Sequence, residues 1–112
     1  MLEKKNKKAM EKVIRNGKVA VLVSPGFGAG WSTWNRDVPE LLFDPAIVQM
    51  VGDGTRPDTI ELYCEAKYPN QYFGGASDLT VVWVPVGTEF VIDEYDGAES
   101  IIFKDQEKWI TA

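Results

Sequence analysis

The chain has 112 residues, 45% of them hydrophobic and 26% charged, with a formal net charge of −5. This composition is that of an ordinary globular protein, so it excludes a disordered chain or a coiled coil, and the length corresponds to one domain. The apolar runs are far shorter than the roughly 20 residues of a membrane helix, and the lysine-rich start lacks the apolar core of a signal peptide. We therefore expect a cytoplasmic protein without membrane association.

The sequence has one cysteine, Cys64, and no histidine. A single cysteine excludes an intramolecular disulfide, and its apolar neighbours predict a buried, inert thiol. Because the commonest general base and metal ligand is missing, we expect no metal and no cofactor. Residues 1–18 carry seven basic and two acidic side chains, whereas residues 19–112 carry five and fifteen. The acidic body disfavours nucleic acid as a partner.

Residues 2–15 are predicted to form a basic helix, with Met10, Val13 and Ile14 in a narrow apolar stripe. The Asn-Gly pair at 16–17 follows, and a left-handed residue of this kind commonly ends a helix. The next run, Val19–Val23, is continuously apolar and mostly β-branched. It predicts a central strand that is covered on both faces.

Helices are expected in the middle of the chain. The segments 37–43 and 44–52 each begin with an aspartate that can cap a helix and contain a proline that fits the first turn, and Gly52 closes the second. A further helix is expected to begin at Asp58 or Thr59 and to run through Lys67. A strand is the alternative there, because the segment is short.

From Leu79 onward the apolar period changes to two, which is typical of strands. The segments 79–85, 89–95, 99–103 and 108–111 are predicted strands, and Asp-Gly at 96–97 is a strong hairpin signal. We therefore predict an α+β fold with one domain over residues 1–112. A four- or five-stranded antiparallel sheet joins this C-terminal meander to the strand at 19–23, and three or four short helices from the first two-thirds of the chain cover it.

The stretch SPGFGAGWSTWNR, residues 24–36, is the best candidate binding surface. It fits neither the G-x-G-x-x-G pattern of dinucleotide-binding proteins nor a phosphate-binding loop that ends in G-K-[ST]. Its glycines would expose backbone amides to an anion, and Trp31 and Trp34 would share a face if the loop runs into a helical turn. In the alternative, the glycines permit a tight turn and both tryptophans fill the core.

A second loop, YPNQYFGGASD at residues 68–78, repeats this combination of aromatic residues and glycines. If the strand that follows pairs antiparallel with Val19–Val23, the two loops meet at one rim of the sheet, whereas parallel pairing separates them. The candidate ligand-binding residues are Gly26, Gly28, Gly30, Trp31, Ser32, Thr33, Trp34, Asn35, Arg36, Tyr72, Phe73 and Gly75.

Acidic residues provide the remaining candidates. Asp93, Glu94, Asp96 and Glu99 lack the spacing of a calcium loop, and we interpret them as a solvated hairpin. No serine lies in a G-x-S-x-G motif and Cys64 has no histidine partner, so we expect a protein without enzymatic activity. A carboxylate-dependent enzyme remains an alternative, and its first candidate residues are Asp37, Glu40 and Asp44.

Four stretches of the chain resemble a family of short, uncharacterised proteins encoded by bacteriophages and prophages: VAVLVSPGFGAGWSTWN, KYPNQYFGGASDL, WVPVGTEFVIDEYDGAESI and the closing W-I-T-A. The resemblance runs from about Lys18 onward and transfers no catalytic residues. It implies a phage protein in the cytoplasm of a bacterial host. Small accessory phage proteins often bind a host protein or sequester a signalling molecule of host defence.

Two main hypotheses follow from the loops and this setting. The first is a non-enzymatic protein that binds a flat, anionic, nucleotide-like molecule and thereby sequesters a host defence signal. The second is a protein-interaction module that docks on a host or virion protein through exposed aromatic residues. A homo-oligomer would suit the first hypothesis, because a deeper pocket forms between subunits than within one short chain.

Overall fold

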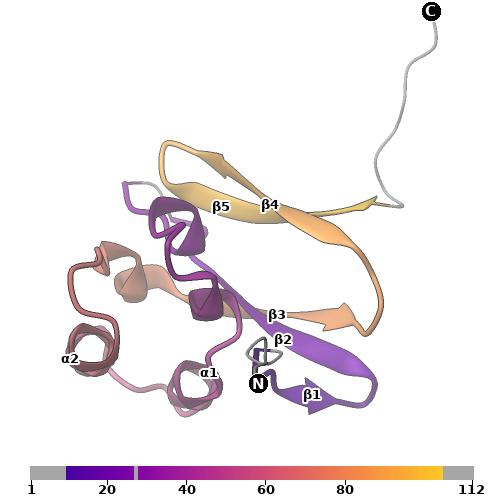
Figure 1. Cartoon of the computed structure of the whole chain (residues 1–112), viewed down its shortest axis with the longest axis horizontal. Coiled ribbons are helices and arrows are strands. Elements are labelled where there is room, and N and C mark those ends of the chain that lie inside the picture. Colours follow the sequence, from indigo (N-terminus) through magenta and orange to yellow (C-terminus); the bar gives the residue numbers. More distant parts are fainter. Residues whose placement is uncertain (1–9, 27, 105–112) are drawn as a thin grey trace, which may run out of the picture.

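The computed structural model describes residues 10–26 and 28–104, which form an α+β fold (Figure 1). The first antiparallel sheet contains, in spatial order, β1 (Ile14–Arg15), β2 (Lys18–Val23) and β3 (Thr80–Pro85). The second is a hairpin of β4 (Phe90–Tyr95) and β5 (Ala98–Phe103). Helices among these residues are α1 (Pro45–Gly52), α2 (Pro57–Lys67) and the 3₁₀ helices η1 (Ser32–Trp34), η2 (Pro39–Leu42) and η3 (Gly74–Asp78). None of the described helices is long and apolar enough to cross a bilayer.

The predicted helix over residues 2–15 is wrong from residue 10 onward, where the description begins. Ile14 and Arg15 instead pair with Val19 and Lys18 in a hairpin. The Asn-Gly pair forms its two-residue turn, with φ angles of 52° and 76°. Two positive φ angles suit the turn that matches the twist of a hairpin, and this preference outweighs the narrow apolar stripe. Residues 1–9 of the predicted helix lie outside the described residues.

β2 is the central strand of its sheet and is covered on both faces, as its continuous apolar run predicted. Ala20 and Leu22 belong to a core on the helix side, and Val21 and Val23 belong to a core on the side of the β4–β5 hairpin. Figure 1 shows the resulting layers, with α1 and α2 on one side of the first sheet and the hairpin on the other. Full burial of each valine or leucine contributes roughly 1.5–3 kcal/mol.

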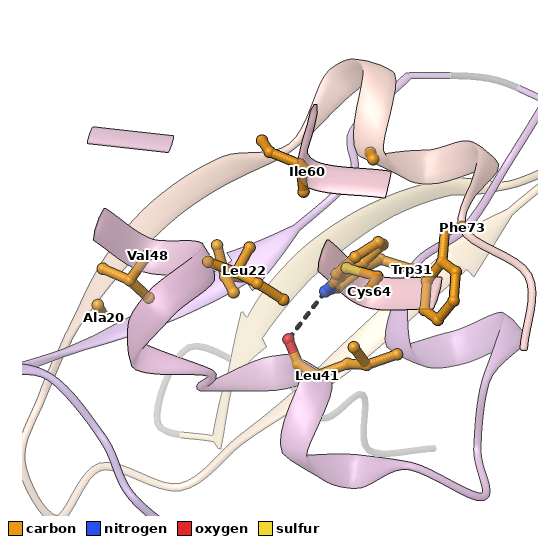
Figure 2. Packing of buried hydrophobic residues seen from close by; sticks show 10 residues of the cluster. Ala20, Leu22, Trp31, Leu41, Val48, Ile60, Cys64 and Phe73 are labelled. Carbon is orange, nitrogen blue, oxygen red and sulfur yellow. Dashed lines mark hydrogen bonds between the residues drawn. The ribbon is translucent and has the colours of Figure 1, made fainter. Parts of the chain in front are cut away.

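The helix-side core is built around Trp31, whose side chain is completely buried (Figure 2). Its indole Nε1 donates a hydrogen bond of 2.8 Å to the carbonyl of Leu41, and its ring lies 5.9 Å from that of Phe73. The thiol of Cys64 is buried in the same core, as predicted. Burial raises the pKa of this thiol to about 12, and nearby carboxylates add to the effect.

β3 pairs antiparallel with β2, with Val21 opposite Val82, as predicted. The helix at 44–52 is confirmed, because α1 begins at Pro45 and Asp44 caps it. The preferred helix before Lys67 is also confirmed, although α2 begins slightly earlier, at Pro57. The segment 37–43 forms only the 3₁₀ helix η2, with Val38 rather than Asp37 at the N-cap position.

The single large sheet is a wrong prediction, because within residues 10–26 and 28–104 the strands β4 and β5 pair only with each other. Their inward side chains, Phe90, Ile92, Ile101 and Phe103, pack against the face of the first sheet. Burial of this apolar face replaces edge pairing as the stabilising contact. The described part of the chain also has fewer α-helices than predicted, and the expected strand at 108–111 lies outside it.

Candidate functional site

The Gly-rich loop (residues 24–36) and the second loop (residues 68–78) meet beside the adjoining ends of β2 and β3. This contact is the consequence expected of antiparallel pairing. The hydroxyl of Ser24 donates a 3.0 Å hydrogen bond to the carbonyl of Gly75. Gly75 in turn lies so close to the carbonyl of Gly30 that a side chain at position 75 has no room. This glycine therefore serves the packing of one loop on the other.

Asn35 connects the two loops most directly. Its Nδ2 donates to the carbonyl of Tyr72 at 2.6 Å, and its Oδ1 accepts from the Tyr72 amide at 2.9 Å. The same Nδ2 also donates to the carbonyl of Trp31. Asn35 is itself buried, and its hydrogen bonds hold the second loop in one position.

Above this connection lie two exposed rings, those of Trp34 and Tyr72, which we call the aromatic pair. Their centroids are 5.8 Å apart and their planes are inclined by 32°. Trp34 is 42% exposed and Tyr72 is 52% exposed. Trp34 lies over Gly30 and Tyr72 over Gly74, and both glycines leave the space that the rings occupy. The glycines of the loops thus support the rings from below.

Glu99, from β5, accepts hydrogen bonds from backbone amides of the Gly-rich loop. Its Oε2 accepts hydrogen bonds from the Trp31 amide at 2.6 Å and from both the amide and the hydroxyl of Thr33. Its Oε1 accepts from the Ser24 amide at 3.0 Å, and the Glu99 amide donates back to the Ser24 carbonyl. The side chain of Glu99 is buried. A carboxylate of the chain itself therefore fills the amide nest that a ligand anion was expected to use.

The turn of the β4–β5 hairpin closes the other side of the Gly-rich loop. The amide of Gly28 donates to the carbonyl of Asp96, and the backbone of Gly97 packs directly on Gly28. Glu94 Oε2 accepts from the Gly97 amide at 2.7 Å and from the indole Nε1 of Trp34 at 3.2 Å. These two bonds hold the pKa of Glu94 below its ordinary value.

The predicted ligand-binding residues fall into three groups by exposure. Four are exposed, namely Gly28, Trp34, Arg36 and Tyr72. Three are half-buried, namely Gly26, Ser32 and Thr33. Five are buried, namely Gly30, Trp31, Asn35, Phe73 and Gly75. The alternative in which tryptophans fill the core describes Trp31 but not Trp34, so the two indoles do not share an open face.

Glu94 and Glu99 are the site residues that sequence reasoning missed, because both were assigned to a solvated hairpin. A signal was present, since Glu99 has the same strand phase as Ile101 and Phe103, and Glu94 the same phase as Ile92. Inward phase in a hairpin with one covered face predicts burial or a specific polar partner. The identity of those partners depends on the loops and could not be inferred locally.

A shallow groove of about 340 Å³ lies between β4 and the two 3₁₀ helices η1 and η2. It is lined by Ser32, Thr33, Arg36, Pro39, Leu42, Val91 and Ile92. A larger hollow of about 520 Å³ lies at the opposite end of the hairpin, between residues 88–91, Ile102 and Lys104. The larger hollow touches neither loop, and it borders the point where the description of the chain ends.

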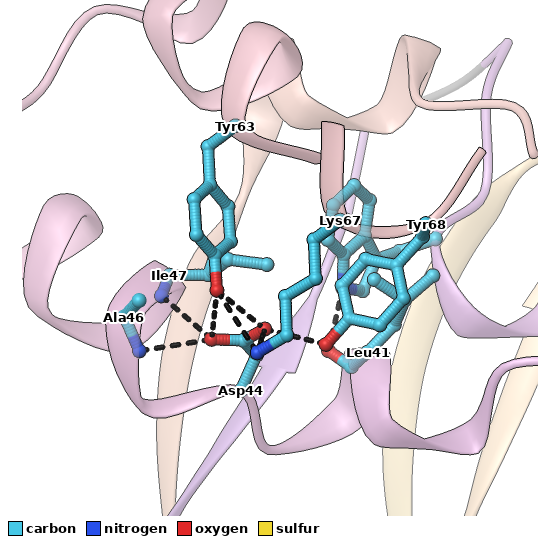
Figure 3. A network of polar contacts seen from close by, with 8 residues as sticks. Leu41, Asp44, Ala46, Ile47, Tyr63, Lys67 and Tyr68 are labelled. Atoms are coloured by element: carbon cyan, nitrogen blue, oxygen red, sulfur yellow. Dashed lines mark hydrogen bonds and ion pairs between the residues drawn. The ribbon is translucent and has the colours of Figure 1, made fainter. Parts of the chain in front are cut away.

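Asp44, a candidate carboxylate of the enzyme alternative, belongs to a separate polar network (Figure 3). It accepts from the amides of α1 at Ala46 and Ile47, and from the side chains of Tyr63, Lys67 and Tyr68. Burial alone would raise the pKa of Asp44, but the hydrogen bonds from Tyr68 and Ile47 and the charge of Lys67 lower it. These contacts join α1 to α2. The other two candidates, Asp37 and Glu40, are exposed.

No protein-family model, no curated protein and no solved structure matches the chain. The resemblance to phage-encoded proteins therefore stays a prediction. Over residues 10–26 and 28–104, no group of three or more cysteine, aspartate or glutamate side chains is placed to hold a metal ion.

Proposed function

We propose that this chain is a non-catalytic binding protein that recognises a partner protein through the aromatic pair. The observation that carries the proposal is the exposure of two large rings, 5.8 Å apart, on a buried and hydrogen-bonded base. Exposed aromatic residues that are already ordered contribute large contact area at little entropic cost, and they are common energetic centres of protein interfaces.

The base beneath the rings supports this role. Asn35 fixes the backbone of Tyr72, and Glu99 fixes the amides of Trp31 and Thr33, which directly precede Trp34 in the Gly-rich loop. Because these groups are bonded before any partner arrives, little ordering remains to be done on binding. The groove of about 340 Å³ beside Thr33 offers an adjoining surface for the same partner.

The sequestration of a flat, anionic molecule is the competing proposal, and it uses the same rings. It requires loop amides that bind the anion, yet the amides of Ser24, Trp31 and Thr33 already bind Glu99. An anionic ligand would have to displace that carboxylate from a buried position. We therefore place the protein partner first.

A co-purification experiment from lysate of the cells that carry the gene tests the proposal. Trp34→Ala and Tyr72→Ala are each expected to lose a stoichiometric partner that the unaltered chain retains. Leu62→Ala is the matched control, because Leu62 is 67% exposed on α2, outside both loops. Retention of every partner by both ring variants, or equal loss with Leu62→Ala, would contradict the proposal. Titration with a nucleotide panel, in which the ring variants are compared with the unaltered chain, tests the competing proposal of an anionic ligand.

A further inference from the structure

We infer that the aromatic pair and Glu94 together form a site for a cationic side chain, an arginine or lysine presented by a basic segment of the partner. This inference rests on the proposed function and specifies the chemistry of the partner. It departs from the anionic ligand that the glycines suggested.

The rings supply the first part of the site. Indole and phenol faces carry negative electrostatic potential and attract a guanidinium or ammonium group placed within about 6 Å of the ring centroid. Trp34 is the strongest such residue type, and Tyr72 lies beside it at an inclination of 32°. A guanidinium placed over Trp34 therefore lies near a second aromatic ring.

Glu94 supplies the second part. Both of its hydrogen bonds end on the same oxygen, Oε2, from Gly97 and from the Trp34 indole. Within the described residues, Oε1 therefore keeps its lone pairs for a further donor. Because Oε2 is bonded at the edge of the indole, a cation over the indole face lies close to this carboxylate. The carboxylate stays ionised at neutral pH, since its pKa is lowered.

The surrounding charge is also negative. The carboxylate of Asp78 packs directly on Gly26, Glu99 fills the loop amides, and Asp96 lies exposed in the adjoining turn. Arg36 is the one basic group whose charge acts on Glu94 among its described neighbours. One positive charge beside four carboxylates leaves a field that repels anions and attracts cations.

The inference is tested with a peptide that alternates glycine and arginine, compared with the same peptide carrying citrulline or glutamate in place of arginine. The readout is the indole N–H resonance of Trp34 in a ¹H–¹⁵N spectrum, assigned by its absence from Trp34→Phe. We expect a saturable shift with the arginine peptide that weakens as salt is added, and no saturable shift with the glutamate peptide. An equal response to the glutamate or citrulline peptide would overturn the inference.

Glu94→Gln is expected to weaken the arginine peptide by roughly two- to five-fold, the range of an exposed cation–π or ionic contact. Asp93→Asn is the matched control, since it removes the same charge from the adjacent position, on the opposite face of β4. Equal weakening by both variants would show a general charge effect and overturn the site. The spectrum of each variant without peptide reports whether it has folded.

Two outcomes separate this inference from the proposed function. If Trp34→Ala loses its partner but the arginine peptide does not bind, the cationic chemistry is wrong and the binding surface stands. If the ring variants keep every partner, the proposed function fails regardless of the peptide.

Deletion of residues 1–9, which contain four lysines, tests whether the chain fills its own site. A shifted Trp34 resonance with tighter peptide binding after deletion would overturn the assignment to a partner.

Discussion

Asn35 pairs with the backbone of Tyr72 through two hydrogen bonds, one donated at 2.6 Å and one accepted at 2.9 Å. Two residues paired across an antiparallel sheet exchange the same two hydrogen bonds through their backbones. Here the side-chain amide of Asn35 takes the place of one backbone. The buried side chain of Asn35 therefore holds in place the backbone of Tyr72, a residue that is 52% exposed. The aromatic pair is therefore ordered by the loop beneath it rather than by contacts between the rings alone.

Asn35→Ala is expected to lower the free energy of unfolding by about 1–3 kcal/mol, because it leaves the buried carbonyl of Trp31 and the partly buried amide and carbonyl of Tyr72 without this partner. The amide of Tyr72 should also exchange with solvent at least about five-fold faster. Hydrogen exchange and chemical denaturation measure the two effects. Ser77→Ala removes an exposed hydrogen bond of the same loop and should change stability by no more than about 0.5 kcal/mol. Unchanged Tyr72 exchange in Asn35→Ala would refute the role given to this side chain.

Glu99→Gln is expected to cost about 2–4 kcal/mol of stability. The substitution turns an NH₂ group toward loop amides that need an acceptor, in a buried position. Urea denaturation measures the loss. Glu89→Gln is the control, because its ion pair with Lys104 is exposed on both sides and should contribute less than about 0.5 kcal/mol. Equal effects of the two substitutions would mean that Glu99 does not organise the loop.

The two tryptophans of the Gly-rich loop should differ in fluorescence. Trp34→Phe is expected to remove emission that acrylamide quenches readily, whereas Trp31→Phe should remove a shielded component, since Trp31 is fully buried. Trp31→Phe should also cost roughly 2–3 kcal/mol, because it leaves a cavity and removes the donor to the Leu41 carbonyl. Trp83 and Trp109 are present in both variants, so the variants differ only in which loop tryptophan they keep. Similar quenching in the two variants would contradict this difference in exposure.

The stability of the protein should depend on Asp44 in acid. Its pKa is below the ordinary value of about 3.9 in the folded chain. Its contribution is therefore fully present above about pH 4 and is lost as the pH falls through the lowered folded value. Asp44→Asn keeps a helix-capping oxygen but should flatten the loss of stability below pH 4. Asp53→Asn, an exposed change at the other end of α1, should keep the slope of the unaltered chain.

Cys64 should be unreactive in the folded protein. Burial raises the pKa of its thiol to about 12, so almost no thiolate is present at pH 8, whereas an unfolded cysteine titrates near 8.5. Labelling with a thiol reagent is expected to proceed at the rate of unfolding and to accelerate in denaturant. Rapid stoichiometric labelling without denaturant would place the thiol at the surface.

Local signals predicted much of the fold. The apolar run of β2, the Asp-Pro start of α1 and the Asp-Gly turn between β4 and β5 each depend on residues within a few positions of one another. Asn-Gly at 16–17 is equally local, but its interpretation as the end of a helix is wrong, because the pair forms the turn between β1 and β2. Antiparallel pairing of β2 with β3 then predicted that the two loops meet, and their contacts confirm it.

By itself, the sequence determined which segments are strands, turns and helices over most of the described chain, and which two loops carry aromatic residues and glycines. Only the tertiary structure decided that Trp31 is buried while Trp34 is exposed, and that the loop amides bind Glu99. The physical reason is distance along the chain, since Glu99 lies 68 residues beyond Trp31. Periodicity and turn preferences describe neighbours, whereas the partner of a loop amide is set by whichever distant strand the packing brings against it.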